Sequence, residues 1–433
     1  MSNVQVGILG CFMLLALLAA SMPVAFAMAI VGFIGFAVVR SPDAAMSMIT
    51  LDLYNTFSSY SLTVIPLFVL MGQVAFHAGI SRRLFNAAYH WLGGLTGGLA
   101  MSTVGACTAF GAICGSGPAT AATMASVALP EMKRYGYNME LSCGAVAAGG
   151  SLGMLIPPSV VFIVYAIMTE QSVGQLFVAG IVPGLLIATL FCLTIYINCK
   201  LRPHLAPPAQ HFSLWKKIAS LSGAIETLLL FMLVIGGMFR GWFTPTEAAA
   251  IGAAGAIVIA LAKRQLTFRM MMRSLQETVR TSCMVMIIVT GAVIFGHFLA
   301  VTRIPFELAT SLAKLPLPGW TIMAIVILFY LVAGCFVDAL GLILLTIPIF
   351  YPVVTQLGYD PIWFGVVIVV VTQMGVISPP VGVCVYVVSG IERDVPLQTI
   401  FRGALPFLAA LIVAAALLIA FPRLCLFLPA LIK

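Results

Sequence analysis

Charged residues are scarce in this chain. Only 8% of its 433 residues are Asp, Glu, Lys or Arg, whereas 62% are hydrophobic. In soluble domains roughly a quarter of the residues are charged, because their surfaces contact water. The composition therefore excludes a soluble globular protein and predicts an all-α polytopic membrane protein.

Motifs for catalysis and nucleotide binding are also absent. There is no G-x-x-x-x-G-K-[ST] motif, so ATP does not drive this chain directly, and no His/Cys cluster or Ser/His/Asp arrangement indicates an enzyme. The ten cysteines stand singly in apolar stretches, which favours packing over disulfides or a metal site. The net charge of +8 is spread over short connecting segments and indicates membrane topology. We expect no enzymatic activity, no cofactor and no nucleic-acid partner.

Two stretches rich in glycine and proline interrupt the apolar sequence. They are residues 114–120, CGSGPAT, and residues 153–158, GMLIPP. Helical backbone should break at both, and in a bilayer a break survives only where protein or a polar cavity satisfies the freed N–H and C=O groups. We therefore expect the two breaks to face one site.

The second half of the chain repeats this pattern 222 positions later. Seven identical pairs share this offset without a gap: Pro130 and Pro352, Gly136 and Gly358, Tyr137 and Tyr359, Gly153 and Gly375, Pro157 and Pro379, Pro158 and Pro380, Glu170 and Glu392. In secondary transporters, an internal repeat of this kind holds the substrate site at its interface. We expect the same here.

Each repeat is predicted to contain a re-entrant hairpin and a helix broken at its diproline. The whole chain is predicted to have about ten transmembrane helices in addition to the two hairpins. The expected parts are N-terminal scaffold helices at 1–60; a first repeat at 61–200 with hairpin 93–130 and broken helix 141–168; a linker, scaffold helices and an amphipathic helix at 201–280; and a second repeat at 281–425, which opens with a span at 283–301 and has hairpin 320–352 and broken helix 363–389.

The positive residues indicate that the repeats are inverted. Arg82, Arg83, Lys133 and Arg134 flank the first hairpin and place its ends on the cytoplasmic side, whereas the matching positions of the second hairpin hold no cation. Five crossings separate the hairpins, and an odd number inverts the second repeat. We expect Arg82 and Arg83 to lie in water, and Glu226 to be interfacial.

Uncharged oxygen atoms at the breaks suit a desolvated monovalent cation. Proline has no N–H, so unwinding of residues 153–158 leaves carbonyl oxygens unpaired, and the hairpin tip offers a hydroxyl and further carbonyls. Converging helix N-termini favour an anionic substrate between two cation sites. Sodium site 1 is predicted at Cys114, Gly115, Ser116, Gly117, Gly153, Ile156 and Pro158; sodium site 2 at Asp338, Gly341, Thr372, Gly375, Ser378 and Pro380; and the substrate contacts at Ser116, Pro118, Thr120 and Asp338.

Asp338 is the one carboxylate predicted at mid-membrane. A charge there costs roughly 2.5 to 3.5 kcal/mol on the insertion scale, so we assign Asp338 a functional role. For Gln73 and His297 a hydrogen bond to a neighbouring helix is favoured over a proton relay. The alternative for the glycines and prolines is that they only allow close packing and kinks, but two repeat-related diprolines favour the sites.

The motifs quoted above also resemble a known family. Residues 115–120 (GSGPAT), 129–132 (LPEM), 135–137 (YGY), 153–158 and 375–380 (GVISPP) are similar to the large membrane subunit of tripartite ATP-independent periplasmic (TRAP) transporters. The resemblance implies an elevator-type Na⁺ symporter of the bacterial inner membrane. It also implies two partners: a small four-helix membrane subunit, expected as a separate polypeptide, and a soluble periplasmic receptor that delivers an organic acid. Residues 337–339 do not copy residues 116–118, so the ligands at the second hairpin rest on less of the family pattern.

The alternatives to a receptor-dependent carrier are an ion channel, a receptor-independent sodium/dicarboxylate symporter, and a membrane enzyme or structural scaffold. An ion channel would also use re-entrant hairpins, but it needs a continuous polar lining, whereas these arms are mostly Ala, Val, Ile and Leu. A receptor-independent sodium/dicarboxylate symporter shares the same features. A membrane enzyme would need catalytic clusters and a structural scaffold would need unbroken helices, and the sequence has neither. The resemblance implies C4-dicarboxylates, sialic acid, keto acids or sulfonates as substrates, and in this family the soluble receptor largely determines which of them is carried.

Overall fold

A computed structural model describes residues 2–210, 212–314 and 318–431, and within this part every regular element is a helix. The chain is therefore an all-α polytopic membrane protein. Its elements are α1 (Asn3–Ala19), α2 (Val24–Val39), α3 (Pro42–Phe57), η1 (Tyr60–Thr63), α4 (Val64–His77), α5 (Ile80–Leu92), α6 (Gly98–Cys114), α7 (Gly117–Arg134), α8 (Met139–Ser151), η2 (Leu152–Met154), α9 (Val160–Thr169), α10 (Val173–Leu201), η3 (Pro203–Leu205), α11 (Leu214–Phe231), η4 (Met232–Gly236), α12 (Gly237–Phe239), α13 (Pro245–Ala262), α14 (Phe268–Thr302), α15 (Ile304–Lys314), α16 (Gly319–Gly334), α17 (Ala339–Gln356), α18 (Pro361–Ile377), α19 (Val383–Ile391), α20 (Leu397–Ala420) and α21 (Arg423–Ala430).

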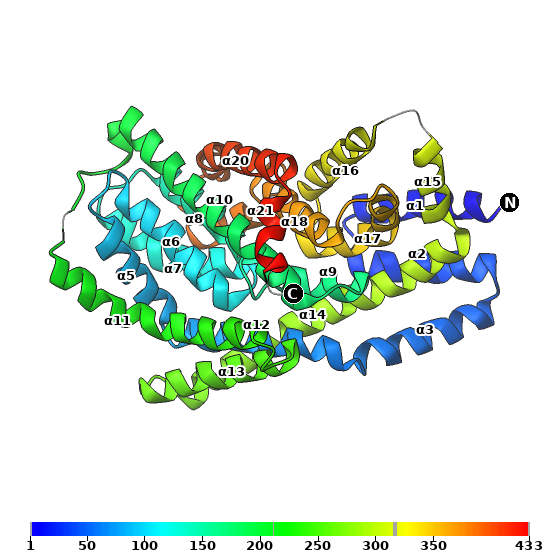
Figure 1. Ribbon diagram of the computed structural model, residues 1–433, viewed down its shortest axis with the longest axis horizontal. Coiled ribbons are helices and arrows are strands. Elements are labelled where there is room, and N and C mark those ends of the chain that lie inside the picture. Colours follow the sequence, from blue (N-terminus) through cyan, green and yellow to red (C-terminus); the bar gives the residue numbers. More distant parts are fainter. Residues whose placement is uncertain (1, 211, 315–317, 432–433) are drawn as a thin grey trace.

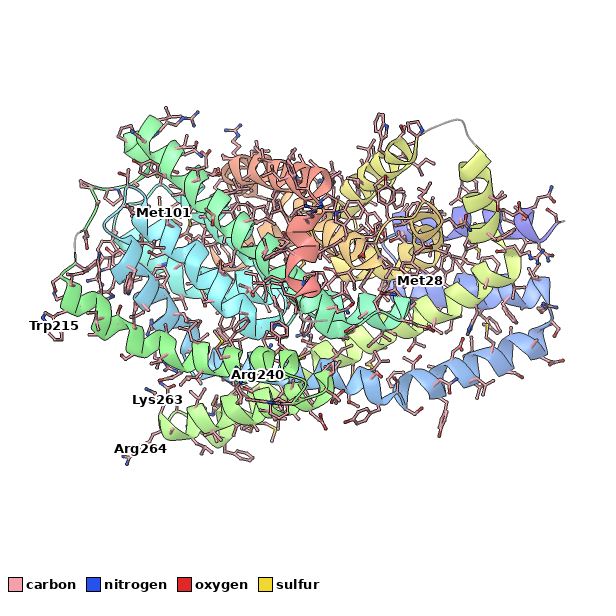
Figure 2. The ribbon with its side chains drawn as sticks, viewed as in Figure 1. Met28, Met101, Trp215, Arg240, Lys263 and Arg264 are labelled. Atoms are coloured by element: carbon pink, nitrogen blue, oxygen red, sulfur yellow. The ribbon has the colours of Figure 1, made fainter. Side chains whose placement is uncertain are left out.

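Most helices form two groups, which we call the scaffold and the core, while α5 belongs to neither and packs against both core helix α6 and scaffold helix α11. The scaffold comprises α1–α4 and α11–α14: α2 packs against α14, α13 packs against α4, and α4 packs against α14. In Figure 1, α11, α13, α14 and α3 run along the lower edge, and the core, α6–α10 and α16–α20, lies above them. The scaffold exposes large apolar side chains, as Trp215 on α11 shows, while Met28 on α2 is buried (Figure 2).

The core contains the same elements twice, in the same order. A hairpin (α6–α7, then α16–α17) is followed by a broken helix (α8–η2–α9, then α18–α19) and a continuous helix (α10, then α20). The two sets interlock, because α7 packs against α19 and α17 packs against α9, while α8 packs against α20 and α10 against α18. The core is thus one body made from both repeats.

Polar contacts between the repeats show their relative orientation. Lys133, at the base of the first hairpin, contacts Glu392 and Asp394 in the turn after the second broken helix, both at 3.1 Å. Reciprocally, Gln171, in the turn after the first broken helix, donates to the Tyr351 hydroxyl at the base of the second hairpin (3.1 Å). Each broken helix carries the chain from the base of its own hairpin to the opposite face. Because the base of each hairpin contacts the turn after the broken helix of the other repeat, the two hairpin bases lie on opposite faces. The repeats are therefore inverted.

The interface between scaffold and core differs from the interface between the repeats. Within the described residues, no hydrogen bond joins a core helix to a scaffold helix, whereas several cross between the repeats. One of these is donated by the Gln373 amide to the Ser151 carbonyl at 3.0 Å. Bonds inside the scaffold also occur, such as that between His297 and Asp52 (2.9 Å), as expected for His297. The two bodies meet mainly through apolar packing.

Seven helices of the described part are long and apolar enough to cross a membrane by themselves. These seven include α17, which is an arm of the second hairpin, whereas α1, α2 and the broken-helix pieces α9 and α18 are apolar but shorter. The expected amphipathic helix before the span at 283–301 is not separate: α14 runs without a break from Phe268 to Thr302. This expectation was wrong because residues 268–290 contain no glycine or proline that would end a helix.

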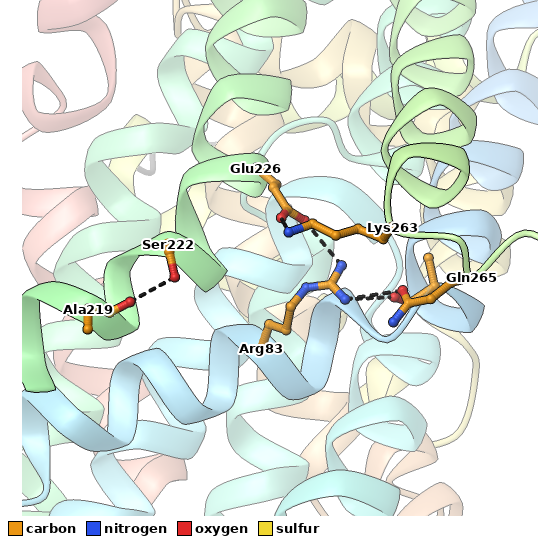
Figure 3. Close-up of polar contacts among 7 residues, drawn as sticks. Arg83, Ala219, Ser222, Glu226, Lys263 and Gln265 are labelled. Atoms are coloured by element: carbon orange, nitrogen blue, oxygen red, sulfur yellow. Dashed lines mark hydrogen bonds and ion pairs between the residues drawn. The ribbon is translucent and has the colours of Figure 1, made fainter.

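Arg83 is also placed differently from the expectation. Its guanidinium contacts Glu226 of α11 at 3.2 Å and the side-chain oxygen of Gln265 at 3.2 Å, and only 21% of its side chain is exposed (Figure 3). Lys263, at the end of α13, reaches the other oxygen of Glu226 at 2.5 Å. The cluster fastens α5 to α11 and α13. Arg83 therefore lies in an ion pair and not free in water. The side chain of its partner Glu226 is 13% exposed.

Candidate functional site

The first broken helix unwinds where the sequence predicts. After η2 the backbone leaves the helix at residues 155–159, and α9 begins at Val160. Pro157 and Pro158 supply no N–H in this segment, and the bond between them is cis. Ser159 caps α9: its hydroxyl accepts from the Phe162 N–H (3.4 Å) and donates to the Met154 carbonyl. The break is therefore held by its own polar groups.

The tip of the first hairpin lies against this break. Gly115 ends α6 in the left-handed region (φ +66°), which glycine adopts without strain, and Ser116 precedes α7. The Gly115 carbonyl accepts from the Val160 N–H at 3.2 Å. The Thr120 hydroxyl donates to the Ser116 carbonyl at 2.8 Å and braces the tip. The hairpin and the broken helix thus share backbone hydrogen bonding.

The second repeat has the equivalent contact. The Val381 N–H, just after Pro379 and Pro380, donates to the Cys335 carbonyl at the end of α16 (3.2 Å). The Pro379–Pro380 bond is also cis. Ser378 ends α18, and its hydroxyl donates to the Met374 carbonyl at 2.6 Å. Each hairpin is therefore fastened to its broken helix by a backbone bond just after the diproline.

Glycine pairs allow the close approach in each repeat. A β-carbon on Gly111 would lie 2.9 Å from the α-carbon of Gly153, and one on Gly375 would lie 2.6 Å from the α-carbon of Gly334. Such distances are too short for any side chain. These glycines therefore do permit close packing, as the alternative interpretation expected. The packing brings each hairpin arm against its broken helix beside the break.

A cavity of about 470 Å³ joins both hairpin tips to the scaffold. Its core side is formed by residues 114–119, by residues 338–340 and by the segments around the two breaks. Its scaffold side comes from α4 and α14. The polar side chains in the lining are Gln73, Ser116, Thr281 and Asp338, and all four are half-buried. The first hairpin tip, the second hairpin tip and the scaffold helices α4 and α14 therefore meet at one place.

Most residues predicted for sodium site 1 lie together. Cys114, Gly115, Ser116 and Gly117 line the cavity. Gly115 faces the Pro158 carbonyl oxygen, and a β-carbon on Gly153 would lie 2.8 Å from the Ser116 carbonyl oxygen. That oxygen already accepts two bonds from Thr120. Ile156 lies apart, because its side chain packs against Gly184 of α10.

The residues predicted for sodium site 2 are more dispersed. The Thr372 hydroxyl donates to the Val369 carbonyl of its own helix at 2.9 Å, and Pro380 is exposed. Gly341 lies in the first turn of α17 and faces α2. A β-carbon on Gly341 would lie 3.6 Å from the Val24 side chain. The hairpin residue beside Gly375 is instead Gly334, and the neighbouring Cys335 carbonyl accepts from Val381. Asp338 caps α17, accepting from the Leu340 N–H at 3.1 Å.

Of the predicted substrate contacts, Ser116, Pro118 and Asp338 line the cavity, while Thr120 is fully buried behind the tip. Thr281 was not predicted as a site residue, and for Gln73 an interhelical hydrogen bond was predicted. In the structure the Gln73 side chain faces the cavity and makes no hydrogen bond with the described residues. A lone Gln in an apolar span was the only signal available for this role.

Comparison with known proteins identifies the family. The family model described as "Tripartite ATP-independent periplasmic transporter, DctM component" matches residues 11–424. The chain belongs to this family. It is therefore a multi-pass permease component of a bacterial TRAP transporter, and the resemblance seen in the sequence is confirmed. This family is one of transport proteins, not of enzymes.

Two relatives and one solved structure illustrate the similarity. The "C4-dicarboxylate TRAP transporter large permease protein DctM" of Pseudomonas aeruginosa is 38% identical over 90% of both chains. The "Sialic acid TRAP transporter large permease protein SiaM" of Vibrio cholerae is 33% identical over 96% of both chains. The structure of the Alcanivorax borkumensis YdaH transporter matches 90% of this chain and 89% of its own with a TM-score of 0.62, at 14% identity. The last comparison concerns the fold alone.

Proposed function

We propose that this chain imports a small organic anion into the cytoplasm by Na⁺ symport across the bacterial inner membrane. A soluble periplasmic receptor delivers the anion, and a small four-helix membrane subunit completes the permease. The anion is a carboxylate or a sulfonate. The observation that carries the proposal is the single cavity on which both hairpin tips and both broken helices converge.

Sodium coupling is supported by the chemistry of this cavity. Its core side offers backbone carbonyl oxygens at the breaks, the Ser116 hydroxyl and the Asp338 carboxylate, which are oxygen ligands of the kind that bind alkali cations. Among the described residues, no arginine or lysine lines the cavity, so bound Na⁺ would supply the positive charge that an anion needs. Coupling follows because the anion binds well only beside the cations.

An elevator movement is supported by the distribution of hydrogen bonds. The two repeats are joined within the core by bonds such as those of Lys133 and Gln171, but the described core helices share no hydrogen bond with the scaffold. A body held to its neighbour by apolar contacts slides without leaving buried polar groups unpaired. We propose that the core carries the cavity across the membrane against α4 and α14.

The alternatives differ in one observable each. A channel would conduct down a solute gradient and would not accumulate solute. A receptor-independent sodium/dicarboxylate symporter would work without the soluble receptor. Uptake into proteoliposomes should therefore be measured with and without the receptor, the small subunit and an inward Na⁺ gradient.

Site variants connect this function to the cavity. Ser116→Ala and Asp338→Asn should each raise the Na⁺ concentration for half-maximal uptake about tenfold, which is the loss of roughly 1.4 kcal/mol of binding free energy. The control is Ser126→Ala on the same helix: the Ser126 hydroxyl donates to the Thr123 carbonyl (2.7 Å) and does not line the cavity. Equal Na⁺ dependence in all three variants would contradict the site.

A further inference from the structure

The scaffold wall of the cavity is apolar except at two positions. Six scaffold residues line it: Val69 and Gln73 from α4, and Thr281, Met284, Val285 and Ile288 from α14. Gln73 and Thr281 are therefore the polar groups that α4 and α14 present to the hairpin tips. They face the cavity that also contains Ser116 and Asp338.

Thr281 differs from the other threonines of its helix. Thr278, Thr290 and Thr302 all donate their hydroxyl hydrogen to a carbonyl of α14 itself, at 2.7 to 2.9 Å. Such a bond satisfies a hydroxyl in an apolar helix. The Thr281 hydroxyl makes no bond of this kind within the described residues and borders the cavity instead. It is available for a ligand.

Gln73 is available in the same way. Its backbone carbonyl is bonded by the His77 ring at 2.9 Å, but its side-chain amide has no partner among the described residues. The amide carries two N–H donors. A polar side chain without a partner at the edge of an apolar wall loses hydrogen-bond free energy unless water or a ligand supplies it.

We propose that Gln73 and Thr281 form the scaffold half of the solute site and donate hydrogen bonds to the anionic group of a carboxylate or sulfonate. The inference rests on the proposed transport function and adds residues that determine affinity. Because the cavity lining holds no arginine or lysine, neutral donors are the direct protein contacts that such an anion can find on this wall.

The position of these residues on the fixed body has a consequence for the transport cycle. Ser116 moves with the core, whereas Gln73 and Thr281 stay with the scaffold. The solute contacts both sets while the cavity lies against α4 and α14 and leaves the scaffold set when the core moves. Gln73 and Thr281 therefore set the solute affinity on one side of the membrane only.

The test is uptake kinetics in proteoliposomes that contain this chain with its small subunit and receptor. The probes are succinate, N-acetylneuraminate, pyruvate and isethionate, and the measurement uses those that the wild-type protein accumulates. Gln73→Met and Thr281→Val should raise the KM for solute about 10- to 100-fold, as expected for a lost bond to a charged group. Gln73→Glu, of the same shape but negatively charged, should raise KM further. The Na⁺ concentration for half-maximal uptake at saturating solute should stay unchanged.

Two control variants isolate the cavity effect. Thr278→Val removes a hydroxyl that is bonded inside α14, and Gln175→Met makes the same chemical change on α10, away from the cavity. Both should keep the wild-type KM.

Uptake and efflux should also be compared for Gln73→Met and Thr281→Val. In these variants the KM should change for solute added on one side of the membrane and stay at the wild-type value for solute added on the other.

The outcomes separate this inference from the proposed function. Sodium-driven uptake with an unchanged KM in Gln73→Met and Thr281→Val would overturn the inference and leave the symport intact. A fall in maximal rate alone, or an equal change of KM from both sides, would also overturn it, because it would indicate a structural role. Wild-type uptake that needs no Na⁺ gradient would instead overturn the proposed function.

Discussion

The glycine pair Gly334 and Gly375 gives the sharpest test of the contact between hairpin and broken helix. In Gly375→Ala the new β-carbon would lie 2.2 Å from the carbonyl carbon of Gly334 and 2.6 Å from its α-carbon, whereas carbon atoms pack at about 3.5 to 4.0 Å. The α16 end must therefore move by more than about 1 Å. Overpacking of this kind costs about 1 to 3 kcal/mol. Loss of the bond from Val381 to Cys335 adds about 0.5 to 1.5 kcal/mol, which the better helix propensity of alanine partly offsets.

Gly390→Ala is the matched control, because Gly390 lies in α19 of the same broken helix and a β-carbon there meets nothing within 4 Å. We expect Gly390→Ala to leave the melting temperature unchanged or slightly raised, and Gly375→Ala to lower it. Thermal unfolding in detergent measures both.

The same variants report on sodium binding. A ligand at 100 times its Kd stabilises the folded state by about 2.7 kcal/mol, and a tenfold weaker site reduces this to about 1.4 kcal/mol. The Na⁺-dependent rise in melting temperature should therefore shrink in Gly375→Ala and persist in Gly390→Ala. If the two variants respond alike to sodium, the contact at Gly334 does not shape a sodium site.

Two other predictions concern the ion pairs. Glu226→Gln should reduce the free energy of unfolding by about 1 to 3 kcal/mol, because it leaves Arg83 and Lys263 without their shared carboxylate. The control Glu131→Gln breaks an exposed pair with Arg134 at 3.8 Å and should change this free energy by less than about 0.5 kcal/mol. Similar melting temperatures for both variants would contradict the role of the cluster. Hydrogen bonds to Asp394 and Glu392 raise the pKa of Lys133 from 10.5, so the stability that they contribute is present below that pH and is lost as the pH rises through the raised value. Lys133→Gln should therefore melt below the wild type at neutral pH, and the difference should disappear in strong alkali; a difference that is constant with pH would exclude the ion pair as its cause.

Much of this fold could be predicted from the sequence because its signals are local or repeated. Diprolines break helices wherever they occur, and the identical offset of Gly153 and Gly375 required a second copy of the same element. The continuity of α14 was missed, because the cluster of basic residues before position 283 indicated a separate surface helix although nothing there ends one.

The site was predictable only in part, for a different reason. Ser116 and Asp338 were identified because a glycine-rich hairpin tip and a carboxylate within an apolar stretch are visible in the sequence. The partners of the second break were not, since Gly334 and Cys335 reach it through the end of α16, whereas Gly341 turns toward α2. The position of Gln73 and Thr281 at the cavity depends on how the scaffold packs against the core. No local sequence pattern predicts that packing.

The central claim is that sodium and an organic anion share the cavity between the hairpin tips. The most direct measurement is solute accumulation in proteoliposomes that hold equal solute concentrations on both sides and are given only an inward Na⁺ gradient, in the presence of receptor and small subunit. The account predicts net accumulation that disappears when the Na⁺ gradient is collapsed and that requires more Na⁺ in Ser116→Ala. Accumulation that continues without a Na⁺ gradient, or equilibration that never exceeds the outside concentration, would contradict it.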